Sequence, residues 1–338
     1  MKLKLLGRSG LRVSELALGT MTFGEAWGWG ASKEESRRIF DTYVEAGGNF
    51  VDTACNYTGG ESERFVGAFV EPIRERIVLA TKYTLTSRRD DPNAGGNHRK
   101  NLVQTLEESL RRLRTDYVDL LWLHMWDGMT PVEEVVRALD DLVSQGKVLY
   151  VGVSDTPAWV VAQAVTLADL RGWSRFVGLQ LPYSIADRDA ERELLPMADA
   201  LGLSVTTWGI LEGGVLTGKY LSEEGTPRRY SGAGDRVNAL AREVLAVAEE
   251  TGATASQVAT GWVRAQPWPI VPILGARTAA QLRESLGVLE IELGQDHVER
   301  LTFASGFRTG FPREFLESSD VRELIFGDTF DRIETTAA

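Results

Sequence analysis

The chain has 338 residues, 43% of them hydrophobic and 25% charged, which is ordinary for a globular protein with a sizeable core. Its net charge of −11 argues against nucleic acid and anionic membranes as partners, because both attract positive surfaces. The sequence contains one cysteine, Cys55, no signal peptide and no apolar run of about 18 residues. We therefore expect a soluble cytoplasmic protein without disulfides.

Eight short apolar segments recur along the chain. Each is rich in Val, Ile and Leu and shows little polar alternation, which is typical of parallel strands buried on both faces. They begin near residues 15, 49, 76, 117, 148, 176, 203 and 269. Segments with helical periodicity lie between them, at 31–48, 100–113, 130–147, 154–170 and 235–252. Ser32 and Thr130 stand where two of these helices should have their N-caps, each followed three residues later by a glutamate.

The alternation of strands and helices predicts a (β/α)8 TIM barrel, a single α/β domain over residues 1–338. The first strand is not followed by G-x-G-x-x-G, so the fingerprint of the open dinucleotide-binding sheet is missing. Residues 2–15 should form a β-hairpin that closes the bottom of the barrel, and residues 306–338 an irregular tail. The stretch 221–236, rich in Gly, Ser and charge, is the longest segment expected to lack regular structure.

Polar residues stand at the ends of three consecutive predicted strands. Asp52 ends the second strand, Lys82 the third and His124 the fourth, and Tyr57 lies in the loop after the second. Each alone has an ordinary explanation: a loop-ordering carboxylate, a solvated lysine, a hydrogen-bonded histidine or a packing aromatic. Because the working residues of such barrels lie at the carboxyl ends of strands, we expect the four to meet at one mouth.

The expected cluster has the chemistry of a proton donor to a carbonyl group. A lysine ammonium at about 4 Å, in an effective dielectric of about 20, favours a phenolate by roughly 4 kcal/mol. At about 1.36 kcal/mol per pKa unit, Lys82 would lower the pKa of Tyr57 by about 3 units, toward the range useful to a general acid. Asp52 would keep Lys82 protonated, and a neutral His124 could orient the carbonyl oxygen. The cluster supplies no electrons, so a hydride donor must come from elsewhere.

The second half of the sequence has features suited to a dinucleotide. Residues 208–220 follow the seventh strand and contain four glycines, which form either a flexible loop or a cradle of amides for a pyrophosphate. Trp208 offers a flat face to a nicotinamide ring. After the eighth strand, Thr278 and Gln281 predict a helix start, a common phosphate site in barrels. Arg277, just before that helix, favours the extra 2′-phosphate of NADP over NAD.

Several motifs, taken in order, resemble those of the aldo-keto reductase superfamily, most closely its microbial and potassium-channel-β-like branches. They read LGRSGLRVSELALGTMTFG, FVDTACNY, ATK, GVSD, GGVLTGKY and GARTAAQLRES, and the resemblance runs from residue 1 to about 315. The resemblance implies a barrel enzyme that reduces a small-molecule aldehyde or ketone with NADP(H) as its cofactor. It places a catalytic tetrad on Asp52, Tyr57, Lys82 and His124.

The resemblance also implies contacts with the cofactor. Those around the nicotinamide and the strand ends fall on Gly19, Thr20, Met21, Asp52, Ser154, Asp155, Gln180, Trp208 and Gly209. The phosphate-binding loop falls on Leu211, Gly213, Leu216, Gly218 and Lys219. The contacts with the adenosine 2′-phosphate and the adenine fall on Gly275, Arg277, Gln281, Glu284 and Ser285.

Three positions depart from the family pattern. Asp155 replaces the usual Asn, and a carboxylate cannot donate a hydrogen bond to the carboxamide oxygen. Ser285 stands where Asn is common, which weakens the expected adenine contact. Glu212 lies near the expected pyrophosphate and would repel it unless its carboxylate points away.

The substrate pocket and two alternative functions complete the expectations. An aromatic-lined pocket at the barrel mouth is expected from Phe23, Trp27, Trp29, Tyr57, His124 and Trp126, although tryptophans in such loops also serve as lids over a core. One alternative is a regulatory subunit that binds NADPH with little turnover, as in the channel-associated relatives. Another is a barrel metallohydrolase, but the chain has three histidines and neither H-x-H nor H-E-x-x-H, so no metal is expected. The physiological substrate, the direction of reaction and the oligomeric state stay open.

Overall fold

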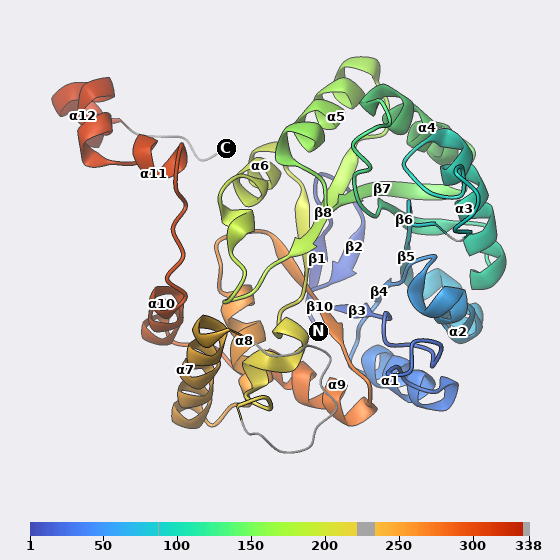
Figure 1. Cartoon of the computed structure of the whole chain (residues 1–338), viewed down its shortest axis with the longest axis horizontal. Helices are drawn as coiled ribbons and strands as arrows, with labels where there is room; N and C mark the ends of the chain where they lie inside the picture. The colour runs from blue at the N-terminus through green and yellow to red at the C-terminus, as the bar shows by residue number, and fades with distance from the viewer. Residues whose placement is uncertain (87, 222–233, 334–338) are drawn as a thin grey trace.

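The computed structural model describes residues 1–86, 88–221 and 234–333 of the chain. Eight parallel strands close into a barrel in the order β10-β3-β4-β5-β6-β7-β8-β9, with helices around the outside (Figure 1). The strands are β3 Ala17–Gly19, β4 Phe50–Asp52, β5 Val78–Tyr83, β6 Val118–Leu123, β7 Val148–Ser154, β8 Phe176–Pro182, β9 Ser204–Trp208 and β10 Ile270–Gly275. Each strand lies in one of the eight predicted segments, so the prediction of a (β/α)8 barrel is confirmed.

The strand registers bring the carboxyl ends of the strands to one rim. Asp52, the last residue of β4, pairs with Ala80 of β5, two residues before Lys82. Lys82 in turn pairs with Trp122 of β6, two residues before His124. Because all barrel strands run in the same direction, the side chains at these ends meet at the same mouth.

Apolar side chains fill the barrel beneath this rim. Phe50, Leu120 and Trp122 are fully buried in one interior cluster. The large indole of Trp122 fits because β7 and β8 carry Gly152 and Gly178 beside it: a Cβ added to Gly152 would lie 2.3 Å from the indole ring. The two glycines therefore leave the space that the indole occupies.

A β-hairpin covers the opposite end of the barrel. β1 Leu3–Leu5 pairs antiparallel with β2 Arg12–Ser14. Gly7 N donates a hydrogen bond to the hydroxyl of Ser204 (2.7 Å), the first residue of β9. Leu6 is fully buried in the interior cluster of the barrel. The hairpin thus closes the end away from the rim, as predicted.

The outer helices and their N-caps agree with the sequence in part. The helices are α1 Lys33–Glu45, α2 Glu61–Val70, α3 Arg99–Leu113, α4 Val132–Ser144, α5 Ala158–Arg171, α6 Leu194–Leu201, α7 Asp235–Thr251, α8 Ala255–Arg264, α9 Ala279–Leu286 and α10 Gln295–Ala304. Ser32 caps α1, because its hydroxyl accepts from Glu35 N (3.3 Å). The prediction that Thr130 caps α4 is wrong: the N-cap is Pro131, and the Thr130 hydroxyl donates to Asp127 (2.7 Å) instead.

The C-terminal segment is more helical than expected. Beyond α10, where an irregular tail was predicted, the chain forms α11 Arg313–Leu316, α12 Ser319–Phe326 and a 3-10 turn, Gly327–Arg332. These elements are too short to give a clear helical period in the sequence. Most of the other expected irregular stretch, 221–236, lies outside the described residues. No helix in the described part of the chain is long and apolar enough to cross a membrane.

Candidate active site

The four titratable residues at the rim form one contiguous cluster. Asp52 ends β4, Lys82 lies near the end of β5, His124 follows β6, and Tyr57 begins the 3-10 turn η1, Tyr57–Gly60. The side chain of Lys82 is completely buried, and those of Asp52 and His124 are nearly so. Tyr57 and His124 contact each other edge to face, with ring centroids 6.1 Å apart. The structure therefore brings together the four residues that the sequence singled out.

The ammonium of Lys82 has all three of its hydrogens engaged. It donates to a carboxylate oxygen of Asp52, to the backbone carbonyl of Thr53 (2.8 Å) and to the hydroxyl of Tyr57 (3.2 Å). An ammonium offers three donors and no acceptor, so this set is complete. Burial disfavours its charge, but the neighbouring Asp52 carboxylate outweighs burial and raises the pKa of Lys82. The result is a fixed, permanently charged lysine at the floor of the mouth.

The hydroxyl of Tyr57 accepts a hydrogen bond and keeps its own proton available. Lys82 is its one hydrogen-bond partner among the described residues. Lys82 does act to lower the pKa of Tyr57, as expected, but the expected net lowering of that pKa is wrong. Burial disfavours the phenolate more than the charge of Lys82 favours it. The negative charges of Asp52 and Asp155 disfavour the phenolate further, so the pKa of Tyr57 is raised. Tyr57 is therefore fully protonated at neutral pH.

His124 is a neutral imidazole in this setting. Burial, together with the charge of Lys82, lowers the pKa of His124 to about 3. Its Nδ1 is buried and has no hydrogen-bond partner among the described residues. Its backbone N donates to the hydroxyl of Thr84 (3.3 Å), which fixes the start of the loop after β6. A neutral imidazole beside a protonated phenol can donate to a carbonyl oxygen but cannot compete with the phenol as an acid.

Polar atoms without partners line the mouth next to this cluster. Ser154 Oγ and Asp155 Oδ1, at the end of β7, are buried and have no hydrogen-bond partner among the described residues. Asp155 has a left-handed backbone, with φ of 41°, and burial raises its pKa to about 6. A carboxyl with that pKa is partly protonated near neutrality, and its protonated form can donate a hydrogen bond. Gln180 is different: its amide donates to Asp52 Oδ1 (3.1 Å) and so joins the ion pair.

Residues after β3 support the same rim. The hydroxyl of Thr20 donates to the Asp52 carbonyl (3.1 Å), and the next threonine, Thr22, donates to Ala276 O (2.5 Å) after β10. A Cβ added to Gly19 would lie 2.7 Å from the Ile273 side chain, so a side chain at this position would collide with β10. The contacts of Gly19 and Thr22 connect β3 to β10, and the bond from Thr20 connects β3 to β4, all at the mouth of the barrel.

The aromatic residues expected at the mouth occupy different places. Trp27 is partly exposed and lies 6.5 Å from the Tyr57 ring and 5.6 Å from Trp29, centroid to centroid. Phe23 is fully buried and packs edge to face on Phe69 of α2, so it belongs to the core. Trp126 packs among apolar side chains of α4 and α5. Among these tryptophans, Trp27 contacts the phenol and Trp29 packs on Trp27. Trp208, at the end of β9, has an exposed indole.

The glycine-rich segment after β9 is a compact turn with left-handed glycines. It contains the 3-10 element η4, Glu212–Thr217, in which Gly213 and Gly214 have φ of 60° and 92°. A Cβ added to Gly214 would lie 2.4 Å from the ammonium of Lys219, which therefore lies against the turn. The Glu212 carboxylate accepts from the Ser184 hydroxyl (2.6 Å), so it is engaged away from the glycines. Left-handed glycines, which allow close approach to the backbone, and one ammonium suit a pyrophosphate.

The start of α9 presents an arginine and a helix N-terminus. The Thr278 hydroxyl accepts from Gln281 N (3.2 Å), while the side-chain Oε1 of Gln281 accepts from Arg277 N (2.9 Å). The side chain of Arg277 is exposed. The side chain of Glu35 of α1, which the sequence pattern assigned to the cap of its own helix, instead accepts from Ala279 N (2.7 Å). That contact between helices was not predicted, because it joins residues far apart in the chain.

The residues expected near the adenine are already engaged within the protein. Glu284 accepts from the Ser256 hydroxyl (2.6 Å), and Ser285 is buried. Gly275, at the end of β10, is exposed and has open space where a Cβ would lie. Gly275, Arg277, Gln281 and Glu284 are exposed, so Ser285 is the member of this group that is buried.

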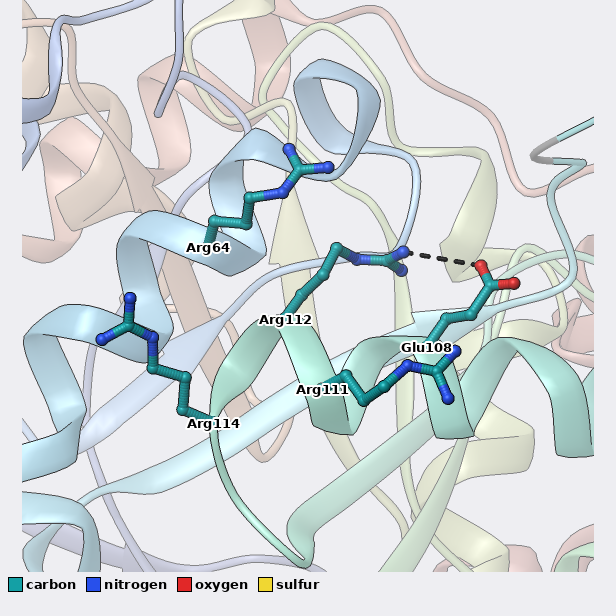
Figure 2. Close-up of a pocket in the computed structure, with 5 residues that line it drawn as sticks. All are labelled: Arg64, Glu108, Arg111, Arg112 and Arg114. Atoms are coloured by element: carbon teal, nitrogen blue, oxygen red, sulfur yellow. Dashed lines mark ion pairs between the residues drawn. The ribbon is translucent and has the colours of Figure 1, made fainter.

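A separate hollow lies on the outside of the barrel. It has a volume of about 410 Å³ and is lined by Arg64, Glu108, Arg111, Arg112 and Arg114, from α2, α3 and the residue that ends α3 (Figure 2). Arg112 pairs with Glu108 (3.5 Å) and with the fully buried carboxylate of Glu63 (2.6 Å). The pair with Glu63 holds α2 against α3, and none of the four rim residues takes part in these ion pairs.

The histidines lie apart from one another. His98 caps α3 by accepting from Asn101 N (3.3 Å), His297 contacts Glu250 (3.2 Å), and His124 lies at the mouth. Within the described ranges, no group of three His, Cys, Asp or Glu side chains could hold a metal ion.

The closed barrel, with a buried titratable cluster at its carboxyl rim, defines an enzyme of the (β/α)8 class. The model of the Aldo/keto reductase family matches residues 15–305, so the chain belongs to this family. It is 38% identical to norsolorinic acid reductase of Aspergillus flavus, over 92% of this chain and 83% of that protein. It is 37% identical to aryl-alcohol dehydrogenase (NADP(+)) of Phanerodontia chrysosporium, over 95% and 88%. An aryl-alcohol dehydrogenase of Pestalotiopsis microspora is 36% identical, over 92% and 86%.

Proposed function

We propose that this oxidoreductase reduces an aldehyde or ketone to the alcohol with NADPH, and that Tyr57 gives the proton. The observation that carries the proposal is the position of the phenol. Its oxygen accepts from the buried ammonium of Lys82, so its own proton is free to reach a carbonyl oxygen. The aryl-alcohol dehydrogenases and norsolorinic acid reductase among the relatives favour an aromatic carbonyl compound as the substrate class. The tryptophan pair beside Tyr57 suits the same class.

The polar residues of the mouth fit a nicotinamide dinucleotide. Ser154 and Asp155 offer buried oxygen atoms without partners, which are suited to the carboxamide, and the exposed Trp208 indole offers a face for the ring. The left-handed glycines and Lys219 suit the pyrophosphate. Arg277 at the start of α9 suits a 2′-phosphate, which supports NADP over NAD.

The residues of the cluster then have distinct roles in the reduction. Bound NADPH would supply a hydride to the carbonyl carbon. As negative charge grows on the carbonyl oxygen, that oxygen becomes far more basic than a phenolate, so Tyr57 donates its proton despite a raised pKa. The phenolate left behind accepts from the Lys82 ammonium, which Asp52 holds in place. Neutral His124 donates to the same oxygen and orients the substrate.

The proposal is tested by NADPH oxidation with a panel of carbonyl compounds at equal concentrations. Benzaldehydes and aryl ketones should be reduced with higher kcat/KM than aliphatic aldehydes of the same size. NADH should support the same reactions with a much higher KM for the cofactor. Tight NADPH binding without turnover of any compound would contradict the proposal and favour a regulatory subunit.

A further inference from the structure

The end of the chain forms an apolar arm, which we define as residues 306–333. Its two helices, α11 and α12, stand off from the barrel (Figure 1). Phe311 is 83% exposed and Leu324 is 85% exposed. The other large apolar side chains that the arm exposes are Phe315, Leu316, Ile325, Phe326, Phe330 and Ile333. A side chain of this kind on its own is ordinary, but eight along one segment are not.

The arm is attached to the barrel only at its base. Arg313 donates to the Glu191 carbonyl (3.0 Å), and Arg192 donates to the Arg308 carbonyl (3.4 Å). In the described part beyond residue 313, no hydrogen bond or ion pair joins the arm to the barrel. Its outer part is held by contacts of its own, such as Phe326 on Phe330, whose ring centroids are 5.2 Å apart. The arm therefore has an internal structure but no surface of its own chain to cover its apolar side chains.

The exposed apolar area of the arm has the size of a protein interface. With about 200 Å² for a phenylalanine and somewhat less for leucine or isoleucine, the exposed fractions add up to roughly 800 Å². Soluble monomers rarely expose an apolar patch beyond about 300–600 Å². An interface of standard size buries about 800 Å² on each partner. Covering the arm thus calls for a protein partner rather than a small ligand.

A second apolar surface lies on the outside of α5. This helix has no charged residue between 158 and 168, although it lies in the outer ring of the barrel. Trp159 is 66% exposed and Leu170 is 79% exposed, and the exposed side chains of Gln163 and Thr166 lie between them. The neighbouring helix α4 instead places Glu133, Arg137 and other charged side chains outward. Trp159 and Leu170 are thus two large apolar side chains left uncovered on the outward side of this helix. We call the outward side of α5 the α5 face.

We propose that the arm of one copy of this chain docks on the α5 face of a second copy, and that the exchange is reciprocal. Two uncovered apolar surfaces on one chain complement each other in this arrangement. A twofold axis pairs each arm with one α5 face, so the assembly closes at two chains and leaves neither surface exposed. The two arms alone would contribute up to about 1,600 Å² of buried area, before the area of the α5 faces is added, so the interface reaches the size of a stable complex. The proposal does not depend on the reaction proposed above.

Sedimentation of the full chain at concentrations from below one to about 100 μM tests the proposal. The wild-type chain should be a dimer at micromolar concentration. Leu324→Glu on the arm and Trp159→Glu on the α5 face should each weaken dimerisation by about 30-fold or more, because each places a charge in the centre of the contact. Leu170→Glu is a second variant of the α5 face. Met129→Glu, at a site with 84% exposure before α4, is the matched control and should leave the dimer intact.

A mixing experiment separates arm exchange from other arrangements. The two variants are mixed in equal amounts. In a mixed dimer, the intact arm of the Trp159→Glu chain can dock on the intact α5 face of the Leu324→Glu chain, so one of the two contacts is unaltered. Mixed dimers should therefore form more strongly than dimers of either variant alone. A wild-type chain that is monomeric at 100 μM, including one whose arm folds onto its own α5, overturns the proposal. A dimer that survives either variant overturns it too. Circular dichroism confirms that each variant is folded.

Discussion

The Asp52–Lys82 ion pair and the ends of β7 and β9 differ in how far their polar groups are satisfied. On the side of β4 and β5, the Lys82 ammonium uses all its donors and the Asp52 carboxylate accepts from both Lys82 and Gln180. On the side of β7 and β9, Ser154, Asp155 and two threonines hold buried oxygen atoms without partners in the described structure. Buried polar groups are nearly always paired in native proteins. The difference suggests that the proton donor is preassembled, whereas the opposite side is completed by a ligand.

The largest expected effect is on the preassembled side. Tyr57→Phe removes the proton donor and little volume, so kcat for carbonyl reduction should fall by about 10²–10⁴-fold. The dissociation constant for NADPH, measured by fluorescence titration, should change by less than about twofold, because the phenol is not on the cofactor side. Tyr117→Phe, a hydroxyl removed far from the mouth, is the control. Equal loss of NADPH affinity and turnover would place Tyr57 in cofactor binding instead.

Removal of the lysine tests whether the ion pair stabilises the fold as well as the chemistry. Lys82→Met leaves the Asp52 carboxylate buried beside an apolar side chain, so the free energy of unfolding should fall by about 3–5 kcal/mol. The double variant Asp52→Asn, Lys82→Met removes both charges and should regain much of this loss in urea denaturation. A double variant less stable than Lys82→Met would show that the charge of Asp52 is satisfied by Gln180 alone.

On the cofactor side, Arg277 should distinguish the two nicotinamide dinucleotides. Arg277→Ala should weaken NADPH binding by about 10–100-fold, because a charge-assisted pair with the 2′-phosphate contributes about 1.5–3 kcal/mol. NADH binding should stay within about twofold. Arg283→Ala, on an exposed position of the same helix, is the matched control. Equal effects on both cofactors would place the arginine elsewhere in the site.

The remaining expected effect concerns Asp155 and the dependence of stability on pH. Because the pKa of Asp155 rises from 3.8 to about 6 in the folded chain, its ionisation destabilises the fold. This destabilisation is absent below about pH 4 and complete above about pH 6. Asp155→Asn removes this cost and should stabilise the chain by up to about 3 kcal/mol at pH 7. Asparagine tolerates the left-handed backbone at this position. Equal stabilisation at pH 4 and pH 7 would contradict the assignment of the raised pKa.

The strands and their ends could be read from the sequence because both depend on local signals. All eight strands are short apolar runs buried on both faces, and the rim residues Asp52, Lys82 and His124 lie at the ends of those runs. The glycines of the turn after β9 could be read for the same reason, since left-handed turns favour glycine.

Features that depend on packing between distant segments could not be read in the same way. Burial of Phe23 requires Phe69 of α2, and the N-terminal contact of α9 requires Glu35 of α1. The raised pKa of Tyr57 depends on how completely neighbouring loops exclude water, which no spacing in the sequence records. The Coulomb attraction of Lys82 was predictable, but the larger cost of burial was not.

The most direct test of the account is the isotope sensitivity of a single turnover. The enzyme saturated with NADPH or with its 4-deuterated form is mixed with an aromatic aldehyde in H2O or D2O, and NADPH absorbance is followed. The account predicts that deuterium on the cofactor and deuterium in the solvent both slow the same step in the wild-type enzyme. In Tyr57→Phe the solvent effect should disappear from a much slower reaction. A solvent effect of unchanged size, on a rate close to that of the wild type, would show that the proton does not come from Tyr57.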